Sequence, residues 1–433
     1  MATLQLFGFP STFNRWIEEC VTSPHFSLYL NGEVHGFFAG ARGLRQGDPV
    51  SPFLFVLVME VLHLILLQFI EQDGGFAYHW QCKELGLFQL SFADDLILLC
   101  KAEVRSVDLF RRGLELFASL SGLHTNPQKS HLILSKAANG VRTSLLETLG
   151  FQEGRLPLRY LGLPLIASRL TMLDCQPLLQ KIDARIRGWD GVGLSFAGRV
   201  QLIKSVLLAF EVYWAMAFLL PKGVIKEIVK RIRTFLWKGN SSSGYPKVAW
   251  ESVCKPIEEG GQGMRDILAL NRALMSRHLW SIIKHEKESI WVEWITHYRL
   301  RDASIWTVNA KRGAWSWRKM LELRGTLLPH IQLKIGSGES FSLWHDPWHN
   351  LGPLILRFPR GPQLTGTTPM ATLSEVIEDN MWSWPLITDI AHLEIIHNLP
   401  PIHTGCDVIT WDSNGGEFTN AVAYHLFRPQ DLR

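Results

Sequence analysis

The chain has 433 residues, of which 47% are hydrophobic and 19% are charged. These proportions exclude a disordered protein and describe a folded one with two or three domains. The net charge of +4 is small, but residues 181–238 contain eleven Lys or Arg against four acids, whereas residues 366–433 contain nine acids against two arginines. This asymmetry predicts a basic surface in the middle of the chain that attracts a polyanion.

The six cysteines are widely scattered and include no Cys-x-x-Cys pair. This spacing argues against a disulfide framework or a zinc finger and favours a reduced intracellular protein, in the nucleus or the cytoplasm. The first twenty residues lack a basic start followed by a long apolar stretch, so we expect no secretory signal there.

The first 168 residues predict a mixture of helices and strands. Their expected order is a helix at 11–20, a hairpin with strands 26–30 and 36–41 around Asn31-Gly32, a buried helix at 51–70, a hairpin around 91–95, a helix at 107–120 that ends at Gly122, a strand at 130–135 and a strand or turn at 161–165. Because helices and strands do not alternate strictly, the predicted fold class is α+β.

The segment from Phe53 to Ile70 is apolar enough to raise the alternative of a membrane span. Glu60 and His63 would then lie near the middle of the bilayer at a cost of several kcal/mol, and Ser51-Pro52 resembles the capped start of a soluble helix. We therefore expect a buried core helix and no membrane partner.

Beyond residue 170 the periodicity is helical at 173–186, 198–218 and 224–237, with a loop at Ser241–Gly244. From about residue 285 the chain becomes rich in tryptophan. The predicted domains are 1–168, a basic helical region at 169–284 and a small mixed region at 285–433.

Two polar segments stand out among the apolar ones. Ser91-Phe-Ala-Asp-Asp95 lies between apolar runs, where adjacent carboxylates repel each other unless a divalent cation compensates them; an ordinary acidic turn is the alternative. Gly43-Leu-Arg-Gln-Gly-Asp-Pro-Val-Ser-Pro52 combines glycines that allow close backbone approach with Arg45, a phosphate-matching donor, just before a long helix. A capped helix start with an ordinary arginine is its alternative.

Taken together, these segments resemble the reverse transcriptases of non-LTR, LINE-type retrotransposons. Gly122-Leu-His-Thr-Asn-Pro-Gln-Lys-Ser130 and Tyr160-Leu-Gly-Leu-Pro164 resemble the motifs that follow in this family. Trp189, Leu194–Arg199, Phe235-x-Trp237, Trp344-x-Asp-Pro-Trp348 and Trp411–Phe418 resemble the later part of its plant-type members. The resemblance implies a partial right-hand polymerase palm, a helical thumb-like region and the start of a zinc-binding-type region.

The resemblance also implies a two-metal nucleotidyl transfer with Mg²⁺, an RNA template, a DNA primer and deoxynucleoside triphosphates. Asp94 would be the direct metal ligand, Asp95 its weaker partner, and Lys129 would stabilise phosphate charge, with a solvated lysine as the alternative. The expected nucleotide- or template-binding residues are Arg45, Gln46, Gly47, Phe92 and Ala93. The oligomeric state is left open.

In this family a third carboxylate stands on an earlier palm strand, before a helix that ends near a Gly-Phe-Pro. Gly8-Phe9-Pro10 is present, but the chain starts too late to include that strand or the fingers, so we expect weak Mg²⁺ binding and no polymerisation by this polypeptide alone. The alternative function is a non-catalytic nucleic-acid-binding remnant of a retrotransposon. His345 and His349 are expected to be satisfied histidines and not zinc ligands, because Pro347 separates them and no cysteine lies nearby.

Overall fold

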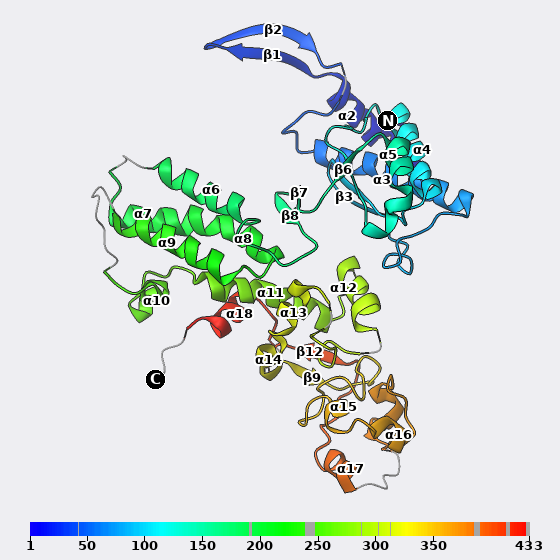
Figure 1. The fold of residues 1–433 in the computed structure, drawn as a ribbon, viewed down its shortest axis with the longest axis vertical. Coiled ribbons are helices and arrows are strands. Elements are labelled where there is room, and N and C mark those ends of the chain that lie inside the picture. The colour runs from blue at the N-terminus through cyan, green and yellow to red at the C-terminus, as the bar shows by residue number, and fades with distance from the viewer. Residues whose placement is uncertain are drawn as a thin grey trace. The chain divides into compact units, whose positions relative to one another are not determined.

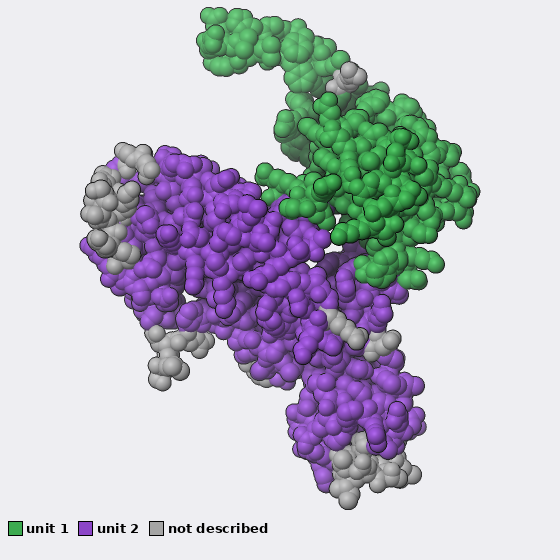
Figure 2. Space-filling model, viewed as in Figure 1, with its two compact units in different colours: residues 1–162 green, residues 163–433 purple. Residues whose placement is uncertain are grey.

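A computed structural model describes residues 1–41, 43–189, 193–238, 247–286, 288–301, 303–311, 313–384, 390–412 and 416–429. The chain divides into two compact units, Met1–Gly162 and Leu163–Arg433, which Figure 2 shows in separate colours. With 49% of residues in helices and 11% in strands, the mixed α+β class is confirmed.

Unit 1 contains helices of 5 to 23 residues and three separate two-stranded sheets, together with the first strand of a fourth pair. Its elements are α1 (Ala2–Leu6), α2 (Ser11–Thr22), β1 (His25–Leu30), β2 (Glu33–Ala39), α3 (Ser51–Asp73), β3 (Gln89–Phe92), β4 (Asp95–Leu98), α4 (Val104–Ser121), β5 (His131–Ile133), α5 (Arg142–Leu149), β6 (Gln152–Gly154) and β7 (Leu158–Tyr160). The predicted order is reproduced, and the short strand β5 pairs in parallel with β6, which the sequence did not reveal.

The core of unit 1 lies between α3 and α4. Leu62, Leu66 and Ile70 of α3 are buried with Phe110 and Phe117 of α4. The helices approach closely because Gly113 of α4 has no side chain: a Cβ there would lie 2.5 Å from a methyl carbon of Leu66. The left-handed backbone of Gly122 then ends α4, as the sequence predicted.

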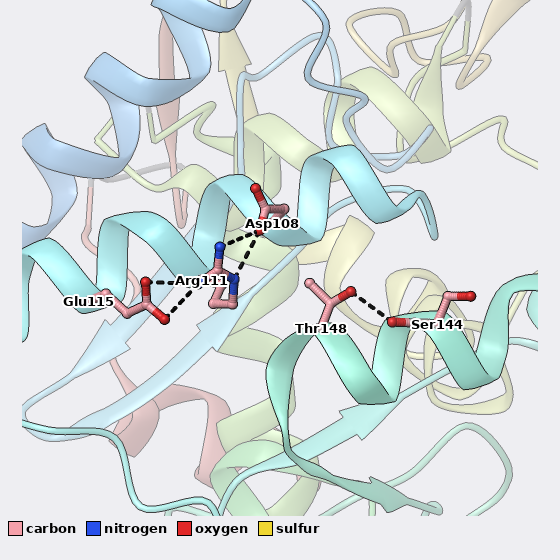
Figure 3. A network of polar contacts seen from close by, with 5 residues as sticks. All are labelled: Asp108, Arg111, Glu115, Ser144 and Thr148. Carbon is pink, nitrogen blue, oxygen red and sulfur yellow. Dashed lines mark hydrogen bonds and ion pairs between the residues drawn. The ribbon is translucent and has the colours of Figure 1, made fainter.

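A polar network fixes side chains on the opposite, solvent side of α4 (Figure 3). The Arg111 guanidinium donates to Asp108 at 2.7 and 2.9 Å and to both carboxylate oxygens of Glu115 at 2.7 and 2.8 Å. On α5, the Thr148 hydroxyl donates to the carbonyl oxygen of Ser144. These contacts join residues three or four positions apart, which face the same side of a helix.

Helix α3 differs from the buried helix that the sequence predicted. Phe53 is 72% exposed and Val56 is 63% exposed, so only the later part of the helix belongs to the core. Its first turn is also different: Val50 is the N-cap residue, and Asp48, not Ser51, accepts a hydrogen bond, from the Val50 amide at 3.0 Å. The sequence missed this because α3 is apolar on all sides and its pattern indicates no exposed face.

Two helical stretches, Ser51–Asp73 and Phe196–Ala217, are long and apolar enough to cross a membrane by length and composition alone. In the first, 22% of the most apolar window is buried in the protein, and in the second 39%. Core helices of globular proteins pass the same criterion, so neither stretch by itself indicates a membrane.

The hairpin β1–β2 projects from unit 1 as an isolated ribbon (Figure 1). Asn31 and Gly32 form the predicted turn, both with positive φ, and the strands pair antiparallel from Leu30↔Glu33 to His25↔Ala39. Every residue of both strands is exposed, including Tyr29 and Phe37. The alternating pattern therefore predicted that the two strands pair, but it did not predict that both faces of the hairpin are exposed.

Unit 2 is mainly helical. Its α-helices and strands are β8 (Leu163–Leu165), which pairs with β7, α6 (Gln176–Arg187), α7 (Phe196–Leu202), α8 (Leu208–Ala217), α9 (Lys222–Lys238), α10 (Trp250–Cys254), α11 (Ile267–Ile283), α12 (Ile290–Ile295), α13 (Trp315–Leu321), α14 (Arg324–Leu327), β9 (Gln332–Lys334), α15 (Leu354–Arg357), α16 (Gly361–Thr365), β10 (Ile377–Glu378), β11 (Met381–Trp382), α17 (Ile390–Ile396), β12 (Val408–Thr410) and α18 (Asn420–Phe427). A π-helix at Ile203–Leu207 joins α7 to α8, so the predicted single helix at 198–218 is interrupted. Ser241–Gly244 lies outside the described residues.

Three hydrophobic clusters hold unit 2 together, and α11 belongs to two of them. Ile267, Leu270 and Leu274 pack with α6, α8 and α9, whereas Leu279 and Trp280 pack with Trp411 and Phe418. The third cluster surrounds the fully buried Trp344. The predicted division of this region near residue 284 stays a prediction, and α11 links the cores on both sides of it.

Candidate active site

The loop before α3 is shaped by its two glycines and by Asp48. Gly43 and Gly47 have φ values of +91° and +89°, which disfavour any residue with a side chain. The Asp48 amide donates to the Arg45 carbonyl, and the Arg45 guanidinium lies 3.7 Å from the Asp48 carboxylate. Arg45 therefore remains exposed on a turn whose backbone is fixed.

This loop borders a pocket of about 350 Å³ within unit 1. Arg45 and Asp48 line it together with Cys20 and Thr22 at the end of α2 and Leu54 of α3. Of the described residues predicted to bind a nucleotide, Arg45 alone lines this pocket; Gln46, Gly47, Phe92 and Ala93 do not. The pocket therefore offers one phosphate-matching donor beside walls that are partly polar and partly apolar.

The paired carboxylates lie at the tip of the hairpin β3–β4. Phe92 pairs with Asp95, so Ala93 and Asp94 form a two-residue turn, with φ of +50° at Ala93. Asp94 is thus a turn residue and Asp95 begins the next strand, which agrees with the hairpin predicted around 91–95. Every residue from Ser91 to Asp95 is exposed, so both carboxylates are accessible to a ligand.

Tyr160 is a neighbour of the carboxylates that the sequence did not connect with them. Partial burial raises the pKa of its phenol, and the negative charge of Asp95 raises it further. Tyr160 ends β7, just before Leu161 and Gly162, which both have positive φ and connect β7 to β8. The motif around Tyr160 was visible in the sequence, but its proximity to Asp95 depends on the tertiary fold.

Lys129 is held by its backbone and not by its side chain. The side-chain carbonyl of Asn126 accepts hydrogen bonds from the amides of Gln128 and Lys129, at 3.0 and 3.2 Å. This local turn leaves the Lys129 side chain exposed. Asn followed by Pro is a recognisable turn signal, so Asn126 could have been identified as the residue that positions Lys129.

The predicted basic surface is partly consumed by internal contacts. Arg199 donates to the carbonyl oxygens of Leu194 and Leu236, and Arg231 binds Asp183 at 2.9 Å and also pairs with Glu227. Three other cations of α9 remain exposed at intervals of four residues and share one face of the helix: Lys222, Lys226 and Lys230. Of these, Lys230 also lies 3.9 Å from the carboxylate of Glu227.

The two histidines considered as zinc ligands have protein partners. His349 is buried, with Nε2 bound to the Ile395 carbonyl at 3.1 Å, while Nδ1 accepts from the Leu351 amide. His345 uses Nδ1 in a contact of 2.7 Å with the Thr307 hydroxyl. These contacts agree with satisfied histidines, and burial lowers the pKa of both imidazoles.

The segment that contains the candidate site is similar to known proteins. Residues 1–165 match the family described as "Reverse transcriptase (RNA-dependent DNA polymerase)". The chain is 29% identical over 284 residues to an Arabidopsis thaliana protein named "Putative ribonuclease H protein", an overlap that covers 62% of this chain and 45% of the relative.

Two relatives come from animal transposable elements. The chain is 26% identical over 290 residues to the Pol polyprotein of the type-2 retrotransposable element R2DM of Drosophila melanogaster, covering 65% of this chain and 26% of the relative. It is 26% identical over 274 residues to an uncharacterized 149 kDa protein of transposon TX1 of Xenopus laevis, covering 61% and 20%. The alignments span less than half the length of each of these relatives.

Proposed function

Because residues 1–165 belong to the reverse transcriptase family, in its non-LTR class, we propose that the chain carries the RNA-directed DNA polymerase domain of a retroelement. The observation that carries this proposal is the hairpin β3–β4, which presents Asp94 and Asp95 at an exposed tip. Residues 1–168 would form the palm, residues 169–284 the thumb-like region, and residues 285–433 the start of a zinc-binding-type region. The proposed location is intracellular.

The proposed substrates are an RNA template, a DNA primer and deoxynucleoside triphosphates. Arg45 would bind phosphate from the wall of its pocket, and Gln46 and Gly47 would contact the nucleotide from the same loop. Phe92 and Ala93 would lie beside the substrate, and the Lys129 ammonium would stabilise charge on the leaving phosphate. Magnesium ions would supply the remaining chemistry of the two-metal transfer, by lowering the pKa of the primer hydroxyl and offsetting phosphate charge.

The described residues fit the magnesium ions only in part. Asp94 and Asp95 are oxygen donors of the preferred type, but the described part of the chain contains no group of three His, Cys, Asp or Glu able to hold a metal. A pair of magnesium ions takes more ligands than two exposed carboxylates supply. We therefore propose that this polypeptide binds Mg²⁺ weakly and does not extend a primer by itself.

Metal-directed cleavage tests the location of the site. Fe²⁺ replaces Mg²⁺ at oxygen sites and, with ascorbate and peroxide, cuts the backbone next to the bound ion. We expect cuts near residues 94–95 that excess Mg²⁺ suppresses and that Asp94→Asn with Asp95→Asn abolishes. Glu33→Gln, at another exposed hairpin turn, is the matched control and should leave the cuts unchanged. Cuts that survive the double substitution would refute the metal site.

Primer extension tests the incomplete fit separately. With an RNA template, a DNA primer and Mg²⁺, we expect no product from the wild-type chain. Extension that Asp94→Ala abolishes would show that the two carboxylates suffice, and would overturn the proposed inactivity while supporting the polymerase assignment.

The second candidate function is non-catalytic binding of an RNA–DNA hybrid, and the lysine face of α9 favours it. Lys222, Lys226 and Lys230 are exposed on one face, and phosphate contacts make binding strongly salt-dependent. Replacing all three by Gln should reduce the slope of log K against log salt by about 3, roughly one per lost contact. The control is Lys319→Gln, which removes a lysine of α13 that pairs with Glu322. Salt-independent binding would exclude this function.

We propose no membrane partner, although α3 is long and apolar enough to span a bilayer. Alkaline carbonate extraction of the expressed chain tests this, since a protein retained in the membrane fraction would contradict it.

A further inference from the structure

A second cavity, of about 250 Å³, lies in unit 2 where two hydrophobic clusters meet. Trp306 belongs to one cluster and Phe341 to the other, and the paired residues Leu333 and Ile409 of β9 and β12 pack against both. All four line the cavity. Its volume lies just below the range of about 300–1,000 Å³ typical of sites for drug-sized ligands, which suits one flat ring system.

One carboxylate lies among these apolar walls. Asp346 accepts a hydrogen bond from the Ser342 amide at 2.8 Å, and the Ser304 hydroxyl is its second polar neighbour. Burial raises the pKa of this carboxyl, which shows that its charged form is poorly solvated. A carboxylate only accepts hydrogen bonds, so a ligand that satisfies it must present N–H or O–H donors.

Two basic residues border the same cavity, and both have a strained backbone. Arg301 follows the π-helix Thr296–Leu300 with φ of +52°, and His285 has φ of +49°. Such conformations disfavour residues with side chains and cluster at binding sites. Both side chains are exposed, so they can contact an anionic group at the rim while an attached ring enters the cavity.

We propose that this cavity binds the base of a single unpaired guanine nucleotide. The apolar walls would enclose the ring, and Asp346 would accept from the N1 and N2 donors, which lie on one edge of guanine. Arg301 and His285 would contact the 5′-phosphate. Adenine and cytosine present one amino group each to such an acceptor, so they bind less well. The site lies in unit 2 and does not depend on the polymerase proposal.

Calorimetric titration of the full chain with guanosine monophosphate tests this site. We expect binding that is roughly 10- to 100-fold tighter than for adenosine monophosphate, and a similar loss in Asp346→Asn, which keeps the acceptor for Ser342 but offers guanine an amide group. Arg301→Ala should weaken binding of the nucleotide but leave binding of guanosine unchanged. Asp94→Ala, in unit 1, should bind as the wild type does.

Circular dichroism shows whether Asp346→Asn is folded. If it is not, Ala303→Trp decides, because it fills the cavity without removing the carboxylate and should abolish binding. The proposal is overturned if guanosine monophosphate does not bind at millimolar concentration or if adenosine monophosphate binds equally well. It is also overturned if folded Asp346→Asn or folded Ala303→Trp binds guanosine monophosphate like the wild type.

Discussion

Unit 1 and unit 2 differ in how their apolar side chains are covered. In unit 1 the hairpin β1–β2 is exposed along its whole length, and α3 leaves Phe53 and Val56 in solvent. In unit 2 three clusters bury large side chains, among them Trp344 at 0% exposure. The motifs around Arg45 and Asp94 thus lie on exposed turns of unit 1, while most of the buried hydrophobic residues belong to unit 2.

The residues of the candidate site and most of the stabilising core therefore belong to different units of this chain. Arg45 lies on a loop shaped by two glycines with positive φ, and Asp94 lies on a two-residue turn in which Ala93 has positive φ. Isolated two-stranded sheets are marginally stable in water, so such turns depend on the helices α3 and α4 behind them. Substitutions should therefore have large effects in the clusters of unit 2 and small ones on the strands of unit 1.

Trp344→Ala should have the largest effect. The ring is fully buried, its Nε1 donates to Thr367 at 3.0 Å, and a Cβ at Gly361 would lie 2.2 Å from a ring carbon. Removing a ring this tightly enclosed costs about 3–5 kcal/mol. Hydrogen exchange should show lost protection across residues 335–376, with a smaller loss in Trp344→Phe. Unchanged protection would contradict the packing of this cluster.

Glu211→Gln should stabilise unit 2. Glu211 is fully buried on α8, and neither carboxylate oxygen has a hydrogen-bond partner among the residues that the structure describes. Burial, and to a lesser degree Asp266, raises its pKa well above the ordinary value, against an opposing effect of Arg265. Between the ordinary and the raised pKa the folded state binds more protons than the unfolded state, so wild-type stability falls as the pH rises through this window.

The glutamine variant should remove that fall, so that its stability relative to the wild type is greater at pH 8 than at pH 5 in urea unfolding. Glu227→Gln on α9 is the control and should change the stability in the opposite direction. Arg231 lowers the pKa of Glu227, so the charged form of this residue stabilises the folded state. A glutamine variant with the wild-type pH dependence would show that Glu211 is solvated.

Arg111→Ala should have a small effect on α4. Its side chain is 36% exposed and pairs with Asp108 and Glu115 (Figure 3). Exposed pairs of this kind contribute little to stability, because water and salt screen them. Hydrogen exchange of α4 measures the loss, which should shrink in 0.5 M salt because the pairs are screened. An effect that does not change with salt would indicate lost packing instead.

Phe37→Ser should have the smallest effect. Phe37 is 77% exposed on β2 and contacts the ring of His25 at 4.8 Å between centroids. A change at such a surface position alters stability by about 0.5 kcal/mol or less. Thermal unfolding measures it, with solubility as a second readout that should improve. A much larger loss of stability would show that the hairpin is covered in solution. The two units would then differ less in how well their apolar side chains are covered.

Local signals predicted the local features well. The alternation around Asn31-Gly32 predicted the first hairpin, and the period that ends at Gly122 predicted α4. Features that depend on distant contacts were not predicted: the parallel pair β5–β6, the proximity of Asp95 to Tyr160 and the exposed start of α3. The sequence of a helix that is apolar on all sides does not indicate which side packs against a neighbour, so it cannot indicate which side is exposed.

Helix α11 has a consequence for cooperativity. Because its residues Ile267–Ile283 contribute side chains to two clusters, neither cluster can lose its packing without disturbing a wall of the other. Those two clusters should therefore melt in one calorimetric transition, although they lie on either side of the predicted boundary at residue 284. A cut between Ile283 and Ile290 would separate α11 from α12 and its neighbours. Trp280 would then lie on the first fragment and its aromatic partners Trp411 and Phe418 on the second.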